Sequence, residues 1–103
     1  MKEKGIFKIK VKGIERMMHY LEEDSVMCAL SLSDAGLFED LKEDGHIEVN
    51  PEVKGGQYFP AELKINENKE QVQQLFNQML EMNHTWFKEF DDRLVILEVT
   101  IKK

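Results

Sequence analysis

Apolar and charged residues alternate in the first segment of the chain, GIFKIKVKG. Phe7, Ile9 and Val11 are separated by three lysines, which is the period-two pattern of a strand with one buried and one solvated face. In the next segment, 14–24, apolar residues instead recur at spacings of three and four, at Ile14, Met17, Met18 and Leu21. This change of period predicts a short amphipathic helix after the strand.

A continuous apolar run, VMCALSL at 26–32, has the length of a buried strand. Periodicity alone also allows an extension of the preceding helix, and we favour the strand. The segment 33–45 then begins with Ser33 and Asp34 as candidate N-caps, and Gly45 is placed to end it. With apolar residues at helical spacing between them, these residues predict a second short helix.

Residues 46–66 have the pattern of a β-hairpin around Gly55 and Gly56. The residues expected to point inward all have odd numbers, namely Ile47, Val49, Val53, Phe59, Leu63 and Ile65. Facing residues of an antiparallel pair share one side of the sheet, so each odd-numbered residue faces another odd-numbered residue and the two numbers sum to an even value. An even sum requires an odd number of loop residues. We therefore predict a loop of three or five residues with a glycine in the left-handed region. Since proline lacks an N–H, Pro51 predicts an edge strand and Pro60 the start of its partner or a bulge.

The strongest helical signal runs from Asn68 to about Phe90. Asn68 and Gln71 resemble a capping box, and apolar residues follow at spacings of three and four, namely Val72, Leu75, Phe76, Met79, Leu80, Trp86, Phe87 and Phe90. The last segment, 93–103, alternates as a strand, with the inward set at Val95, Leu97, Val99 and Ile101. We expect Leu94 and Ile96 on the opposite side, which is more apolar than a solvated face requires.

With 103 residues, the chain is expected to form a single domain over 1–103. The elements predict an α+β fold in which a mainly antiparallel sheet of four or five strands has its helices on one face, in the order βαβαββαβ. The alternative is a ferredoxin-like βαββαβ order with a helical insertion at 14–44.

The net charge is −6, and residues 17–92 carry all of the excess, with five lysines against seventeen acidic residues. Phosphate backbones require clustered Lys and Arg, so this balance argues against a nucleic-acid partner. No apolar run approaches the ~20 residues of a membrane span, and no secretory leader pattern follows the N-terminus. Because Cys28 is the lone cysteine and lies in an apolar run, we expect a buried, reduced thiol and a cytoplasmic protein.

The stretch MNHTWFKEFDD at 82–92 is the first candidate site. On a helix, Trp86 and Phe90 share a stripe that packing onto the sheet explains. Phe87 points about 100° away from Trp86, so both are buried only if the helix end is enclosed on two sides or meets a partner or ligand. Leu94 and Ile96 add apolar surface that we expect to form an interface.

The same region also contains the parts of a small-ligand site. Trp86, or Tyr58 from the hairpin, offers a ring that stacks on a ligand ring, and an anion would meet one of the polar side chains His84, Lys88 and Arg93.

Metal and catalytic sites are not expected. His19 has Glu22 and Glu23 at helical spacing, but two or three ligands on one short segment do not make a zinc site. Cys28 shows no paired base, and no serine lies in a recognised nucleophile turn. We therefore expect neither a cofactor nor enzymatic activity.

These observations favour a small acidic, non-enzymatic interaction module that binds a protein partner or self-associates as a homodimer. The alternative is a binder of a small molecule or nucleotide-sized metabolite with an aromatic pocket. A second alternative is an acidic inhibitor that imitates phosphates toward a basic protein.

Overall fold

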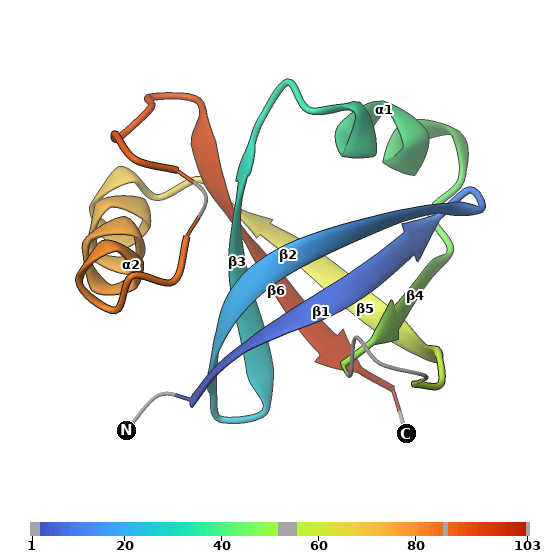
Figure 1. The fold of residues 1–103 in the computed structure, drawn as a ribbon. Helices are drawn as coiled ribbons and strands as arrows, with labels where there is room; N and C mark the ends of the chain where they lie inside the picture. The colour runs from blue at the N-terminus through green and yellow to red at the C-terminus, as the bar shows by residue number, and fades with distance from the viewer. Residues whose placement is uncertain (1–2, 52–55, 86, 103) are drawn as a thin grey trace.

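The structure, a computed structural model, describes residues 3–51, 56–85 and 87–102, and these form a closed six-stranded antiparallel barrel with two helices (Figure 1). The strands lie in the order β1-β2-β3-β6-β5-β4, and β4 closes the barrel onto β1. The elements along the chain are β1 (Glu3–Val11), β2 (Ile14–Glu23), β3 (Val26–Leu32), α1 (Gly36–Glu43), β4 (Ile47–Asn50), β5 (Phe59–Asn66), α2 (Lys69–Glu81) and β6 (Leu94–Ile101).

The predicted α+β sheet with helices on one face is wrong, and so are both predicted element orders. The main cause is the segment 14–23, which forms β2 instead of a helix. Lys12 and Gly13 both have positive φ angles, 55° and 78°, in a two-residue turn that brings Ile14 opposite Val11. This is the type I′ geometry that matches the twist of two paired strands.

β2 imitates helical spacing because it has apolar residues on both faces. Its second half is covered on both sides, whereas Ile14 and Met17 in its first half are 46% and 42% exposed. Met18 and Tyr20 pack against the barrel interior, whereas Leu21 is buried from the outside in a cluster with α2. A strand with two covered faces has apolar residues next to one another, so its alternation is lost. The next turn, at Asp24 and Ser25, also has two positive φ angles and leads into β3, which confirms the predicted strand at 26–32.

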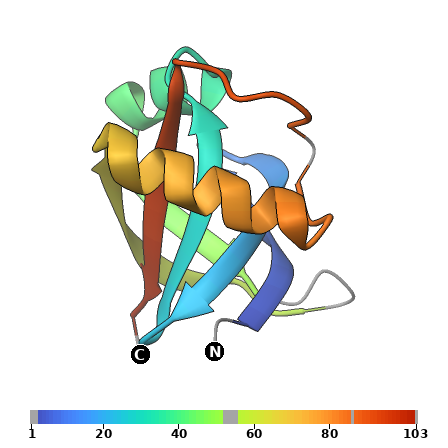
Figure 2. The ribbon, with the colours of Figure 1, turned by 90° about the vertical axis from the view of Figure 1, so that its left-hand side faces the viewer.

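Two apolar clusters stabilise the fold. The first fills the barrel and is built from residues such as Phe7, Val49 and Leu97, with Leu37 of α1 packed against them. The second lies between α2 and the outer surface of the barrel, where α2 crosses β3 and β6 (Figure 2). Cys28 lies at the edge of this second cluster and is half-buried, whereas we expected a buried thiol.

The predicted helix over 68–90 is right at its start and wrong at its end. Asn68 accepts a hydrogen bond from the backbone N–H of Gln71, as predicted. The helix stops at Glu81 because Asn83 adopts a φ of 52°, and the backbone N–H groups of Asn83 and His84 donate to Leu80 and Met79. This pair of bonds is the Schellman motif, in which a left-handed residue terminates a helix. Residues 84, 85 and 87–93 are therefore part of a loop.

The predicted antiparallel pairing in the hairpin over 46–66, with facing residue numbers that sum to an even value, is confirmed. Val49 pairs with Phe59 and Glu48 with Pro60, so the paired numbers sum to an even value. The connection from Asn50 to Phe59 is longer than the predicted three or five residues. Val53 and Gly55 lie outside the described residues.

Two further predictions for this hairpin are wrong. β4, which Pro51 follows, is paired on both sides, with β1 and β5, so it is no edge strand. Phe59 and Ile65, expected inward, are exposed by 36% and 46%.

The predicted helix over 33–45 is confirmed as α1, with small changes at both ends. Its N-cap is Ala35, which makes no side-chain hydrogen bond, and its C-cap is Asp44. Neither Ser33 nor Asp34 caps this helix as predicted.

Candidate functional site: a slot between β2 and β3

The pairing between β2 and β3 is short. β2 pairs with β1 from Ile14 to Glu22, but its pairing with β3 covers only Leu21, Glu22 and Glu23. Above these pairs, the first half of β2 and the second half of β3 diverge (Figure 1). A cavity of about 190 Å³ opens between them, which we call the β2–β3 slot.

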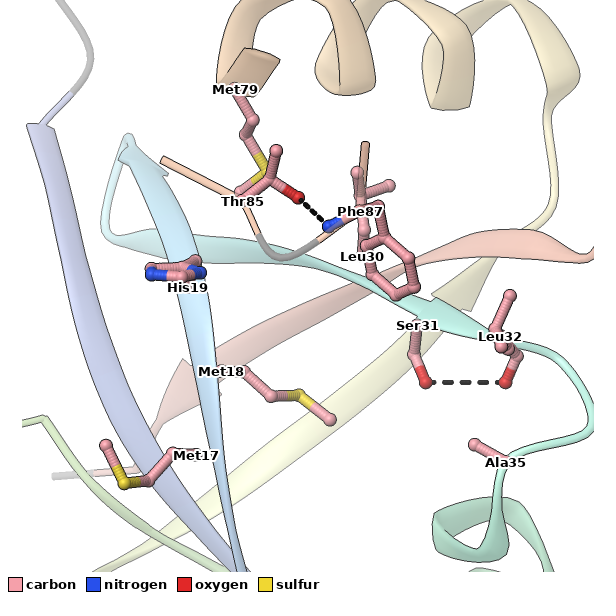
Figure 3. Close-up of a pocket in the computed structure, with 10 residues that line it drawn as sticks. All are labelled: Met17, Met18, His19, Leu30, Ser31, Leu32, Ala35, Met79, Thr85 and Phe87. Carbon is pink, nitrogen blue, oxygen red and sulfur yellow. Dashed lines mark hydrogen bonds between the residues drawn. The ribbon is translucent and has the colours of Figure 1, made fainter. Parts of the chain in front are cut away.

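The lining of the β2–β3 slot is mainly apolar (Figure 3). Its apolar side chains come from β2, β3, α2 and the loop after α2, and they include Met17, Met18, Leu30, Leu32, Met79 and Phe87. Polar groups enter at His19, Ser31 and Thr85. An apolar wall with a few polar groups is typical of sites for small organic molecules.

The volume limits the size of an occupant. An apolar cavity of ~150 Å³ holds a benzene ring, whereas sites for drug-sized ligands are commonly 300–1,000 Å³. The β2–β3 slot, with about 190 Å³, therefore suits a molecule with a single ring and small substituents.

The loop 82–93 forms one rim of the slot and is held to β1. The Nε2–H of His84 donates to the carbonyl oxygen of Gly5 at 2.8 Å, because a carbonyl only accepts. The ring of Tyr20 lies directly over Gly5, where a Cβ atom would come within 2.5 Å of the tyrosine hydroxyl oxygen. Gly5 therefore allows Tyr20 to cover the strand and leaves its carbonyl available to the loop.

A local turn places Phe87 in the slot. The hydroxyl of Thr85 accepts a hydrogen bond from the backbone N–H of Phe87 at 3.1 Å, and the phenyl ring lies near Leu30 (Figure 3). Phe90 turns the other way and packs its ring against Phe76 of α2, with the ring centroids 5.7 Å apart. Among the described residues, Phe87 is thus the predicted aromatic side chain that lines the cavity.

Arg93 fixes the far end of the loop. Its guanidinium donates to Asp34 and Asp91, at 2.8 Å to each. The side-chain and backbone hydrogen bonds that Arg93 donates to Asp91 lower the pKa of Asp91 to about 2. Because both carboxylates already occupy it, Arg93 anchors the loop and is not placed to receive the anion of a ligand.

The other predicted site residues lie apart. Lys88 is exposed on the loop, and Tyr58 lies under the ammonium group of Lys10, which is 4.2 Å from the tyrosine ring centroid. Burial, followed by the charges of Glu15 and Glu48, raises the pKa of Tyr58. Trp86 falls outside the described residues.

The two predicted interface residues are covered by the chain itself. Leu94 is 0% exposed and Ile96 is 5% exposed, and both belong to the cluster beneath α2. They therefore present no surface to a partner.

Sequence reasoning missed the walls of the slot, at Met17, Met18, Ser31 and Ala35. The pair Met17 and Met18 carried a usable signal, because adjacent methionines in one strand point to opposite sides and both need cover. Ser31 carried another signal, because it places a hydroxyl group within an otherwise apolar run. The structure buries this residue to 5% exposure.

His19 and His84 form a contact at the rim, with ring centroids 4.4 Å apart in an edge-to-face arrangement. Burial and the neighbouring His84 lower the pKa of His19. Stability contributed by neutral His19 is therefore full above pH ~6.5, its ordinary pKa, and is lost as the pH falls through the lower pKa of the folded state.

We expect the imidazole of His19 to titrate below its ordinary pKa in an NMR pH titration. A His84→Asn variant removes the second cause of the shift, so the pKa of His19 should rise part of the way back while burial holds it below the ordinary value. A pKa of His19 at or above the ordinary value in the parent protein would contradict this arrangement.

Among the described residues, no group of three or more His, Cys, Asp or Glu side chains lies close enough to hold a metal ion. In the same part of the chain, no helix has the length and hydrophobicity needed to cross a membrane.

Comparison with known proteins supports the fold. No protein-family model matches the chain, and no curated protein matches it. A crystal structure from Listeria innocua, of a protein named as a presumed pyridoxamine 5'-phosphate oxidase, superposes with a TM-score of 0.70. The match covers 95% of this chain and 84% of that one at 13% sequence identity. The likeness establishes a shared barrel fold.

Proposed function

We propose that this protein binds a small ring-containing molecule in the β2–β3 slot and does so without catalysis. The observation that carries the proposal is the apolar cavity of about 190 Å³ that opens where the pairing of β2 and β3 ends. Phe87 offers a ring face to an occupant, and the hydroxyls of Ser31 and Thr85 offer hydrogen bonds that orient it.

The structural neighbour supports a ligand of this size. It is named for an activity on pyridoxamine 5'-phosphate, a molecule with one pyridine ring. A single ring suits the volume of the slot, whereas the nucleotide-sized metabolite expected from the sequence exceeds it.

The interaction module expected from the sequence loses part of its support. Its interface rested on Leu94 and Ile96, which lie beneath α2, and on the aromatic residues Trp86, Phe87 and Phe90. Phe87 lines the slot and Phe90 packs against Phe76, whereas Trp86 lies outside the described residues. An acidic inhibitor would act through surface charge alone and would leave the apolar slot without a role.

A panel of single-ring compounds tests the proposal. At a concentration tenfold above Kd, a ligand that binds the folded state adds about 1.4 kcal/mol, which raises the Tm of a domain of this size by roughly 5–10 °C. Emission of Trp86, the only tryptophan, gives a second readout because Phe87 follows it directly in the chain. Mass spectrometry of the recovered ligand should show it unchanged.

Benzene and xenon are included in the panel because dry apolar cavities bind both. Their effect on the Tm and on the tryptophan emission tests whether the apolar slot binds any small apolar molecule. If neither of these nor any ring compound changes the Tm or the emission, the proposal is wrong. If a compound binds and is recovered chemically altered, the slot is an active site and the non-catalytic part of the proposal is wrong.

A further inference from the structure

The guanidinium of Arg16 lies close to the α1 end of the β2–β3 slot, although Arg16 is not one of the residues that line the slot. Arg16 pairs with Ile9 and Met18 pairs with Phe7, so both side chains leave β2 on the interior side. Met18 lines the slot, and Arg16 is the next interior residue toward α1. Its Nη2 donates to Oδ2 of Asp40 in α1 at 3.0 Å.

The same guanidinium packs next to the wall of the slot. A Cβ atom added to Gly36 would lie 3.3 Å from Nη2 of Arg16, so the group packs against the first residue of α1. The preceding residue, Ala35, lines the slot. The guanidinium therefore lies one residue away from the slot, at the start of α1.

One nitrogen of this guanidinium has no partner. Nη1 of Arg16 is buried and makes no hydrogen bond with any described residue, whereas Nη2 donates to Asp40. Buried polar groups are nearly always hydrogen-bonded, because leaving one unpaired costs its full desolvation. A guanidinium with one edge held and another free is arranged to accept a second oxyanion, since its fork matches carboxylate and phosphate oxygens.

We infer that the slot binds a ligand that carries an oxyanion, a phosphate or a carboxylate, next to its ring, and that Nη1 of Arg16 donates to this group. The inference rests on the proposed function, because the ring of the same ligand occupies the apolar part of the slot. Asp40 neutralises one charge equivalent and holds the guanidinium in place, and the partial positive charge at the start of α1 adds to the attraction. Arg16, not the predicted Arg93 or Lys88, is then the anion-binding residue.

The test uses small anions alone, so that it does not depend on ring binding. The Tm of the full chain is measured in sodium phosphate, in sodium acetate and in sodium chloride at matched ionic strength. Phosphate also stabilises folded proteins by general exclusion from their surface, so the deciding quantity is the difference between variants. We expect the increase in Tm from chloride to phosphate or to acetate to be larger in the parent protein than in Arg16→Gln.

Arg93→Gln is the matched control, since it removes an arginine that two exposed carboxylates already occupy. Its response to the two oxyanions should equal that of the parent. Asp40→Asn is the second test and remains available if Arg16→Gln fails to fold: it frees Nη2 as well, so the oxyanion response should increase. If the part of the response that is lost in Arg16→Gln is larger for phosphate than for acetate, the group is assigned as phosphate, and the reverse order assigns a carboxylate.

Equal oxyanion responses in the parent protein, Arg16→Gln and Asp40→Asn would overturn the inference, whether or not the slot binds rings. Ring binding is scored separately with a matched pair, pyridoxal and pyridoxal 5'-phosphate. If pyridoxal binds equally well to the parent and to Arg16→Gln while its phosphate ester binds about tenfold more weakly to the variant, both proposals are supported. If neither compound binds but the response to free oxyanions depends on Arg16, the anion site stands and the ring site fails.

Discussion

Replacing Leu94 by alanine is expected to lower the free energy of unfolding by about 2–5 kcal/mol. Leu94 is 0% exposed and lies between β6 and α2, so the change removes buried apolar atoms and leaves a cavity that the surrounding barrel cannot fill. Chemical denaturation followed by circular dichroism measures this loss.

Leu80→Ala is the matched control, because it makes the same change on the exposed side of α2, where Leu80 is 46% exposed. Its effect should stay near 0.5–1 kcal/mol. Sedimentation of both variants separates the two roles of Leu94. If Leu94→Ala changed the association state and left the free energy of unfolding unchanged, Leu94 would be an interface residue, as the sequence had suggested.

Replacing Ala35 by phenylalanine is expected to abolish ligand binding, with an affinity loss of at least ~100-fold, equivalent to about 2.7 kcal/mol. Ala35 lines the slot at its α1 end, so a phenyl ring placed there occupies the volume that a ligand needs. Ala35 is also an N-cap without a side-chain hydrogen bond, so the helix loses no cap by the change. Calorimetric titration with any compound that binds the parent protein measures the effect.

Ser33→Phe supplies the control for this variant. Ser33 is exposed two residues before Ala35 and does not line the slot, so the same bulky ring should leave the affinity unchanged. Undiminished affinity in Ala35→Phe, with the fold intact by circular dichroism, would show that the ligand binds elsewhere.

The sequence predicted most elements correctly, since their signals are local. The alternation in β1, the capping side chain of Asn68 and the apolar run of β3 each depend on a few neighbouring residues. The start of α2 was predictable for the same reason, because an N-cap acts within one helical turn.

The barrel was not predictable from the same patterns, because its closure depends on distant segments. β2 was interpreted as a helix because interior packing covers one of its faces, and α2 with its following loop covers part of the other. The turn at Lys12 and Gly13 was the local signal for a strand pair, and it was outweighed by the helical spacing of Met17, Met18 and Leu21. No residue pattern within β1 or β4 indicates that these two strands pair with each other.

The candidate site was found only in part. Phe87 and His84 were predicted, although on a helix, and the left-handed Asn83 that converts this segment to a loop was overlooked. The slot itself arises where β2 and β3 diverge, and such divergence reflects the twist and closure of the whole barrel. Arg16 was missed because β2 was taken for a helix with a solvated face.

β6 takes part in both apolar clusters at once. Leu97 and Val99 face the barrel interior, while Leu94 and Ile96 face α2. Melting α2 away would leave half of this strand uncovered, and opening the barrel would remove the platform on which α2 rests. Cooperativity between the two layers is therefore built into one strand, and the domain should lose both in a single two-state transition.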